Sequence, residues 1–525
     1  MAAESFGGVP GGDRSPTAGR DPDETIVDEP VTTCFLGVDV GTSSSKGVLV
    51  DPTGRVLARA RRTHAVVHPQ PAWAELPARV WWDDAAGLIR ELLGQAPGPV
   101  GAVGVSGMGP CLLVTDAEGT PLRDPILYGN DTRATTQIQR LTAELGAEEI
   151  LDRTGSPLTS QAVGPKIAWI IENEPQVAGA MRRFFMTNSW LAHRLTGEYV
   201  LDHLSASQAG PLYDIDALDW YQPWVDIVAP RLELPRLRWP GDVAGQVTSE
   251  AAATTGLTAG TPVITGTIDA WSEAVSVGAQ RPGDLMLMYG TTMFLLATTA
   301  SKVTSPQLWG TVGALPQTRC LAAGMATSGA VTGWLRDLFA SPDFATLLGE
   351  ATQSPPGSKG LVLLPYLAGE RTPLFDPDAR GLLVGMTLAH GRGDLYRAAL
   401  EATAYGVRHN LEVMQGAGAG ITRVVAVGGG SEGALWTRIV SDVAGLVQEL
   451  PTHTVGASYG AAFLAAASQE AVVIEDWNPK SGEVRPSDQH RQRYDDLYAV
   501  YRDLYPATVD AMHTLATIQR DLRTG

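Results

Sequence analysis

Short apolar runs separated by glycine-containing turns begin at Cys34. Apolar residues recur through positions 34–40, 46–50 and 55–66, and the intervening turns read Gly-Thr-Ser-Ser and Asp-Pro-Thr-Gly. Short runs of this kind, bounded by such turns, are typical of β-strands joined in hairpins. We therefore expect three antiparallel strands at the start of the first domain.

Strand and helix patterns alternate through the rest of the first half. The spacing of apolar residues predicts a helix over 81–95, strands over 100–106 and 112–115, and mostly helices over 135–195. Mixed strands and helices in this order indicate an α/β fold.

A strand, a Gly-Thr turn and a second strand occur once in each half of the chain. The first copy turns at Gly41-Thr42 and the second at Gly290-Thr291, inside the strand pattern of 284–299. This echo predicts two similar halves rather than a tandem solenoid. Further elements are expected over 261–269 (strand), 395–414 (helix), 423–427 (strand), 435–444 and 459–467 (helices), with a single helix after Asp476.

Composition and charge exclude several classes of protein. Residues 1–30 are rich in Gly, Pro, Asp, Glu, Ser and Thr, and this composition predicts a disordered tail. The net charge of −18 repels nucleic acid and anionic lipid. No apolar run is long enough to span a bilayer, and the N-terminus does not resemble a secretory signal. Three scattered cysteines fit a reducing compartment, so we expect a cytoplasmic protein without membrane or nucleic-acid partners.

The first candidate site is the turn after the first strand. Its consecutive amides and hydroxyls could surround phosphate oxygens, and Asp39 at the strand end could hold Mg²⁺ through water. The sequence is not a P-loop, because it lacks the Gly-Lys-Ser/Thr ending of that motif. The alternative interpretation of this segment is an ordinary hairpin turn without a ligand. The residues concerned are Asp39, Gly41, Thr42, Ser43, Ser44 and Lys46.

The second candidate is Asp269, at the end of an apolar run. Alone, it is as well explained by a helix N-cap as by an acid at the mouth of a cleft. A second glycine-threonine turn, Gly290-Thr291-Thr292, follows closely. The acid and both turns could therefore surround one triphosphate.

The third candidate is the glycine run that follows the expected strand 423–427. Gly428, Gly430 and Gly433 form a GxGxxG pattern, and Glu449 lies near the distance expected of a ribose-binding acid in a dehydrogenase. However, residues 450–525 read chiefly as helices and leave too few strands for a dinucleotide fold. The same glycine pattern is explained by a flat loop against which adenine could lie. This loop would consist of Gly428, Gly429, Gly430 and Ser431.

A loop over 364–381 concentrates charged residues. Glu370, Arg371, Asp376, Asp378 and Arg380 crowd it. Such a loop could lock a domain together through ion pairs or take part directly in catalysis, and both interpretations stay open.

The order of these motifs resembles the FGGY carbohydrate kinases, over about residues 33–470. The matching segments are Gly37–Gly47, Lys166–Asn173, Leu364–Pro373 and Asp394–Glu401. The resemblance implies a two-domain fold like that of actin, Hsp70 and hexokinase, built on ribonuclease H-like domains with a cleft between the lobes. It further implies an N-terminal kinase domain over 33–268, a C-terminal one over 269–480 and a helical tail over 481–525.

The resemblance also implies roles for particular residues, with ATP and Mg²⁺ as cofactors. Asp269 becomes the general base, Asp39 the Mg²⁺-associated carboxylate, and the two glycine-threonine turns the phosphate contacts. Gly428 to Ser431 line the adenosine. The sugar lies near Met108, Gly109, Asn130, Asp131, Arg133 and Asp269.

Among the family, the chain is most similar to pentulose kinases, especially xylulose kinases. Gly109 and Ala270 stand where xylulose kinases commonly carry His and Asn, so two groups that could hydrogen-bond sugar hydroxyls are missing. We expect phosphorylation of D-xylulose at its C5 hydroxyl. The alternatives are a kinase for ribulose, gluconate or a polyol, or a non-catalytic actin-like sugar sensor, and a homodimer is left open.

Overall fold

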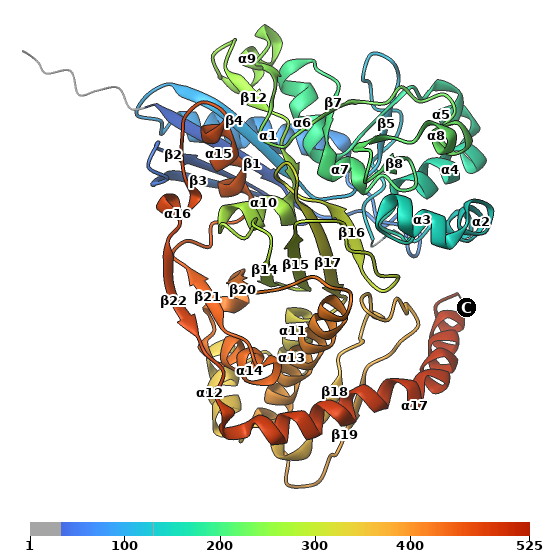
Figure 1. The fold of residues 1–525 in the computed structure, drawn as a ribbon, viewed down its shortest axis with the longest axis vertical. Coiled ribbons are helices and arrows are strands. Elements are labelled where there is room, and N and C mark those ends of the chain that lie inside the picture. Colours follow the sequence, from blue (N-terminus) through green and yellow to red (C-terminus); the bar gives the residue numbers. More distant parts are fainter. Residues whose placement is uncertain (1–32, 130, 525) are drawn as a thin grey trace, which may run out of the picture.

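Two seven-stranded sheets organise the computed structural model, which describes residues 33–129 and 131–524 (Figure 1). The predicted disorder of residues 1–30 lies outside the described residues. The chain forms a mixed α/β protein in which helices surround both sheets, as the sequence predicts.

The first sheet has the strand order β11-β12-β4-β1-β2-β3, with β13 pairing to β4. β1–β2 and β2–β3 pair antiparallel, which confirms the expected meander, while β1–β4 and β4–β12 are parallel. The strands are β1 (Cys34–Val40), β2 (Ser44–Val50), β3 (Val56–Thr63), β4 (Val100–Gly107), β11 (Val243–Gln246), β12 (Pro262–Ile264) and β13 (Thr267–Ile268).

The second sheet has the order β16-β17-β15-β14-β20-β21-β22 and repeats the first. From β17 to β22 its pairings are antiparallel, antiparallel, parallel, parallel and antiparallel, the same series as from β3 to β11. The predicted similarity of the two halves is confirmed. The strands are β14 (Asp284–Tyr289), β15 (Met293–Thr299), β16 (Trp309–Val312), β17 (Arg319–Met325), β20 (Arg423–Val427), β21 (Gln448–Pro451) and β22 (Lys480–Val484).

Helices and short hairpins complete the two halves. The helices are α1 (Ala78–Leu93), α2 (Thr135–Leu145), α3 (Ala147–Thr154), α4 (Val163–Asn173), α5 (Pro175–Ala180), α6 (Thr187–Thr196), α7 (His203–Ser207), α8 (Gln222–Val228), α9 (Ser249–Thr255), α10 (Asp269–Ser276), α11 (Gly329–Leu338), α12 (Phe344–Gln353), α13 (Arg392–Gly416), α14 (Ala434–Ala444), α15 (Ala457–Ala467), α16 (Ile474–Trp477) and α17 (Arg491–Thr524). The remaining strands are β5 (Leu113–Thr115), β6 (Arg183–Phe185), β7 (Val200–Asp202), β8 (Tyr213–Asp214), β9 (Asp219–Trp220), β10 (Arg236–Arg238), β18 (Val362–Leu364) and β19 (Leu382–Val384).

The C-terminal segment differs from the prediction of one helix after Asp476. Strand β22 comes first and extends the second sheet at its edge, and α17 follows. An edge strand is exposed along one side, so β22 is polar and its side chains form ion pairs, as Lys480 does with Glu449 and Glu483. A polar edge strand lacks the apolar alternation that would reveal it in the sequence.

Helix α15 belongs to the second half by sequence but packs on the first sheet. It crosses β1 and β4 and also contacts α10, as Figure 1 shows. Its approach is so close that a Cβ at Gly104 of β4 would overlap the carbonyl of Ala461. Helix α10 directly follows β13 of the first sheet, yet its Trp271 packs against Phe294 of β15 in the second sheet, with ring centroids 5.8 Å apart. The two halves are therefore joined by exchanged helix contacts.

Candidate functional site

The loops that follow equivalent strands of the two sheets carry most of the predicted site residues. Residues 41–43 follow β1 and Met108-Gly109 follows β4, while residues 290–292 follow β14 and Gly428 follows β20. Because β1 is parallel to β4 and β14 to β20, each pair of loops emerges at the same end of its sheet. Each half thus contributes two loops to the candidate site.

Asp39 lies near the end of β1 and is buried. Its neighbours across the sheet are Lys46 on β2 and Ser106 on β4, and its Oδ1 accepts a 2.8 Å hydrogen bond from Ser106 Oγ. Burial raises the pKa of Asp39, against the opposing effects of the Ser106 hydroxyl and the Lys46 ammonium. A bound cation would favour the charged form of this carboxyl.

Asp269 is the first residue of α10 and lines the cavity described below. Its Oδ1 accepts a 2.8 Å hydrogen bond from the backbone N–H of Ala270, so it occupies the N-terminal turn of the helix while facing the cavity. Burial raises its pKa, and the nearby Asp39 carboxylate raises it further. The two acids predicted from the sequence are thus brought within electrostatic range of each other.

A third acid, Glu273, was missed by sequence reasoning. It lies one helical turn after Asp269 on α10 and is buried, and burial raises its pKa to about 7. The i, i+4 spacing places both carboxyls on the same face of the helix. This spacing is the signal that could have identified Glu273.

The turn between β1 and β2 is closed by a 3.2 Å hydrogen bond from Gly41 N–H to Ser44 O. Thr42 Oγ1 lies 2.8 Å from the hydroxyl of Tyr128, which lines the cavity. Ser44 is buried, whereas the side chains of Ser43 and Lys46 are exposed. The Thr42–Tyr128 contact links this turn directly to the cavity.

The equivalent turn between β14 and β15 is closed by a 3.1 Å hydrogen bond from Gly290 N–H to Thr292 O. Thr292 lines the same cavity as Asp269. The carbonyls of Gly290 and Thr291 accept hydrogen bonds from backbone N–H groups at the start of α11. The N-terminus of α11 therefore holds the turn in place through these hydrogen bonds.

The glycine loop after β20 is shaped by packing on two of its three glycines. A Cβ at Gly428, where φ is +87°, would lie 2.6 Å from Tyr289 O, and one at Gly430 would lie 2.7 Å from the Trp436 ring. A Cβ at Gly429, by contrast, would have no atom of the described chain within 4 Å beyond its own neighbours in sequence. Ser431 Oγ donates a 2.7 Å hydrogen bond to Gly428 O and so closes the loop. The space beside Gly429 is therefore open.

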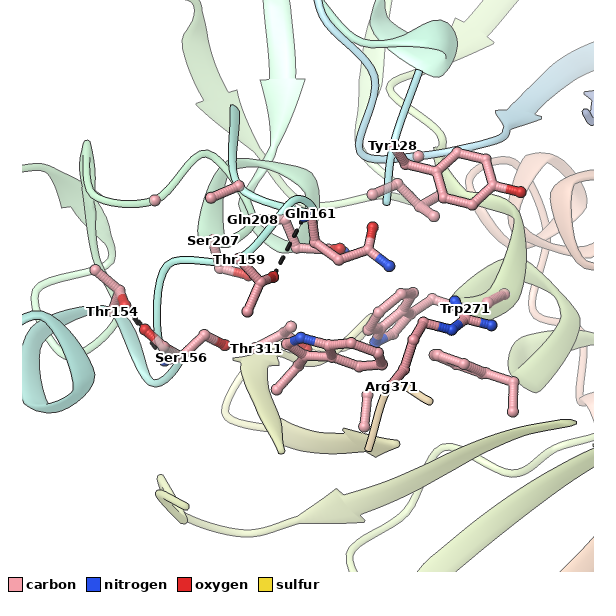
Figure 2. A pocket seen from close by; sticks show the side chains of 18 of the residues that line it. Tyr128, Thr154, Ser156, Thr159, Gln161, Ser207, Gln208, Trp271, Thr311 and Arg371 are labelled. Atoms are coloured by element: carbon pink, nitrogen blue, oxygen red, sulfur yellow. Dashed lines mark hydrogen bonds between the residues drawn. The ribbon is translucent and has the colours of Figure 1, made fainter. Parts of the chain in front are cut away.

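The cavity beside Asp269 lies between loops of the first half and strands of the second sheet. Its empty volume is about 950 Å³, open solvent at its mouth included. Figure 2 shows Thr159, Gln161, Ser207 and Gln208 on one side and Thr311, Trp271 and Arg371 on the other. The wall also includes Gly109, Tyr128, Thr154, Ser156, Pro157, Leu158, Ala162, Gly210, Ile268, Asp269, Ala270, Met288, Thr292, Phe294, Trp309 and Ala322.

Three of the residues expected near the sugar do not line this cavity. Met108 is buried and its carbonyl accepts a 2.9 Å hydrogen bond from Thr187 Oγ1. Asp131 and Arg133 form a buried ion pair of 2.6 Å, and the Arg133 guanidinium lies over the Trp73 ring. Asn130 lies outside the described residues. Because their charges satisfy each other, Asp131 and Arg133 support the loop that carries Tyr128.

Part of the charged loop over 364–381 anchors the C-terminal helix, and another part reaches the cavity. Asp376 accepts hydrogen bonds from Tyr505 and His513 of α17, so this part anchors the C-terminal helix. Arg371, in contrast, lines the cavity while its Nη2 donates to Met325 O. Glu370 is buried below it, and burial raises its pKa to about 7.

The site offers few protein ligands for a metal ion. Across residues 33–129 and 131–524, no three His, Cys, Asp or Glu side chains converge as a metal site. Mg²⁺ usually keeps several waters and binds one or two carboxylates together with substrate phosphates. The buried carboxylate of Asp39, beside a phosphate-type turn, fits that mode of binding.

Over the described part of the chain, no helix combines the length and apolarity needed to cross a membrane.

Comparison with known families matches most of the chain. Residues 34–276 match the N-terminal domain, and residues 285–469 the C-terminal domain, of the FGGY family of carbohydrate kinases. These ranges include both glycine-threonine turns, Asp39, Asp269 and the glycine loop after β20.

Individual relatives cover nearly the full length. The chain is 29% identical to the xylulose kinase of Escherichia coli over 91% of this chain and 100% of that protein. It is 30% identical to a glycerol kinase of Gloeobacter violaceus, over 83% and 88% of the two chains. The crystal structure of a xylulose kinase from Rhodospirillum rubrum superposes with a TM-score of 0.85 and 32% identity, covering 91% of this chain and 100% of that one.

Proposed function

Because the chain belongs to the FGGY family of carbohydrate kinases, and is thus an ATP-dependent sugar kinase, we propose that its acceptor is a pentulose. D-Xylulose, phosphorylated on its C5 hydroxyl, is the first candidate, since xylulose kinases match this chain over nearly their whole length. The observation that supports phosphoryl transfer at this site is Asp269, a carboxyl of raised pKa that lines the cavity together with Thr292 of a phosphate-type turn. The choice of a pentulose rests on the similarity to xylulose kinases.

The proposed roles follow from this placement. Asp269 accepts the proton of the attacking hydroxyl, and the two glycine-threonine turns hold the phosphates of ATP through their amides and hydroxyls. Adenosine lies against the open face of Gly429. Asp39 would hold Mg²⁺, which neutralises phosphate charge when bound. Phosphoryl transfer needs mainly positioning and charge neutralisation, and these groups supply both.

The sugar hydroxyls need partners other than those at Gly109 and Ala270, which have no polar side chain. Thr311 Oγ1 and Gln208 Nε2 are buried, belong to residues that line the cavity, and have no hydrogen-bond partner within the described chain. Leaving a buried polar group unpaired costs roughly 1–3 kcal/mol, which a bound hydroxyl would recover. We therefore assign Thr311 and Gln208 to sugar recognition, and Asp131 and Arg133 to supporting the neighbouring loop.

Other acceptors follow as second candidates. The similarity to a glycerol kinase favours a polyol over ribulose or gluconate. The cytoplasm, as indicated by the composition, is the proposed location of the reaction.

A sugar panel with coupled detection of ADP tests the proposal. We expect the highest kcat/KM with D-xylulose, and a rise in the KM of that sugar in Thr311→Val, which keeps the side-chain shape but removes the hydroxyl. No activity on any ketopentose would contradict the pentulose assignment. An unchanged KM in Thr311→Val would contradict the role of Thr311.

A further inference from the structure

His64, directly after β3, contacts the first phosphate-type turn at several points. Its backbone N–H donates to Ser43 O at 3.2 Å, and its ring Nε2 lies 2.9 Å from Gly41 O. Its Nδ1 lies 2.9 Å from Oδ2 of Asp84 on α1, and the same oxygen accepts a 2.8 Å hydrogen bond from Ser45 Oγ. His64 therefore connects two carbonyls of the turn to helix α1, and Ser45 of β2 reaches the same Asp84 oxygen directly.

Both ring nitrogens of His64 face oxygens that act as acceptors. A backbone carbonyl has no proton to give, and an ionised carboxylate accepts only. An imidazole that donates from both nitrogens carries two N–H groups and a positive charge. The side chains of His64 and Asp84 are only 6% and 17% exposed, so water competes little for these bonds.

The equivalent turn of the second half shows what such contacts achieve. There, Gly290 O accepts from Gly329 N–H at 3.0 Å, and Thr291 O accepts from Ser328 and Ala330 N–H at 3.1 and 3.0 Å. These donors form the N-terminus of α11, whose free N–H groups and helix dipole are positive. Two carbonyls of each turn are thus tied back by positively polarised donors, although the donors come from different elements.

We propose that His64 is a positioning residue for ATP binding, an imidazolium that takes in the first half the place of the α11 N-terminus in the second. Carbonyl oxygens directed at a triphosphate would repel it, so tying back Gly41 O and Ser43 O leaves the turn's N–H groups to face the phosphates. The inference rests on the proposed function only in taking ATP as the ligand of this turn.

Binding of a non-hydrolysable ATP analogue with Mg²⁺, measured by calorimetry without sugar, tests this role. We expect His64→Ala to weaken binding roughly tenfold or more, the scale of a lost hydrogen bond assisted by charge. His64→Gln should recover part of that loss, because its amide nitrogen can donate to Gly41 O. Asp84→Asn should weaken binding less than His64→Ala, because a neutral His64 can still donate from Nε2. His68→Ala, at an exposed histidine of the same segment, is the matched control and should leave binding unchanged.

Three outcomes would overturn the inference. If His64→Ala bound the ATP analogue with unchanged affinity, His64 would have no positioning role. If His64→Ala and His64→Gln lost affinity equally and also had a lowered Tm, the role of His64 would be purely structural. Nitrogen-15 NMR, with His64→Gln identifying the signal, should show both ring nitrogens protonated, and a neutral ring would contradict the imidazolium. A wild type that binds the analogue but phosphorylates no sugar would refute the proposed function while leaving the binding result for His64 intact.

Discussion

At the scale of single residues, the site brings three carboxyl groups together where a negatively charged substrate is expected. Asp39, Asp269 and Glu273 all have raised pKa values, chiefly because they are buried and secondly because the Asp39 charge acts on the other two. A carboxyl of raised pKa is a stronger base once ionised, which suits a group that must accept a hydroxyl proton.

Asp269→Asn should lower kcat by roughly 10²- to 10⁴-fold, the usual contribution of a general base. The asparagine oxygen can still accept the hydrogen bond from Ala270 N–H, so shape and fold should be kept while the proton acceptor is lost. Steady-state kinetics and binding of the ATP analogue check this, and we expect nearly unchanged binding. Glu273→Gln, on the same face of α10 but away from the cavity wall, is the control and should lose much less activity. If Asp269→Asn retained half of the wild-type activity, Asp269 would be excluded as the base.

Glu370 predicts a pH dependence of stability. Burial raises its folded-state pKa from 4.5 to about 7, so the folded protein keeps this proton over a range in which the unfolded chain has released it. The free energy of unfolding should therefore fall as the pH rises from about 4.5 to about 7. Glu370 alone should contribute about 3 kcal/mol to this fall. Glu370 Oε1 accepts from the N–H groups of both Ala326 and Arg371, and a glutamine oxygen can do the same.

Glu370→Gln should accordingly flatten this slope without unfolding the protein. Urea denaturation at a series of pH values between 4.5 and 8 measures it. A variant with the same slope as the wild type would show that Glu370 does not titrate abnormally.

At the scale of elements, the crossing of α10 and α15 is the contact that joins the halves. Ser272 Oγ donates to Ala457 O at 2.7 Å, and Gly460 lets the two helix backbones meet. This crossing also places Asp269, at the start of α10, relative to both sheets.

Gly460→Ala should destabilise the protein by roughly 1–3 kcal/mol or more, because its Cβ would overlap Ser272 O. Gly349→Ala is the matched control, also within a helix but with no described atom within 4 Å of the added Cβ. It should be neutral or stabilising by roughly 0.5–1 kcal/mol, because alanine is the better helix former. Denaturant midpoints compare the two, and equal effects would contradict the close approach.

At the scale of the whole molecule, the two sheets are similar, but neither is independent of the other. Helix α15 returns from the second half to cover β1 and β4, so unfolding either sheet would expose a surface that the other half buries. The candidate ATP site likewise draws one glycine-threonine turn from each sheet.

We therefore expect one cooperative calorimetric transition rather than two. The ATP analogue with Mg²⁺ should shift that whole transition upward, by about 2.7 kcal/mol of stabilisation at a concentration a hundred times Kd. Differential scanning calorimetry measures both effects. Two transitions, only one of which responds to the analogue, would show lobes that unfold separately.

Local sequence was sufficient for most of the strands and turns and for two of the three acids of the site. Apolar runs with glycine-threonine turns specify the hairpins β1–β2 and β14–β15, because turn chemistry and side-chain periodicity act between near neighbours. Asp39, Asp269 and the glycine loop at 428–431 were recognisable for the same reason, since each stands at the end of an apolar strand. The polar strand β22 was not predicted, because an edge strand needs no alternation of apolar residues.

Only the tertiary structure decided which side chains meet at the site. Tyr128, Gln208, Thr311 and Arg371 come from segments far apart in the sequence. They line one cavity because two sheets and their crossing helices bring those segments together. Asp131 and Arg133, though close to Tyr128 in sequence, are instead paired with each other. Periodicity and turn signals carry no information about contacts between distant segments, because such contacts depend on how whole elements pack. For this reason Asp39 and Asp269 were predictable from the sequence, and the residues of the cavity wall were not.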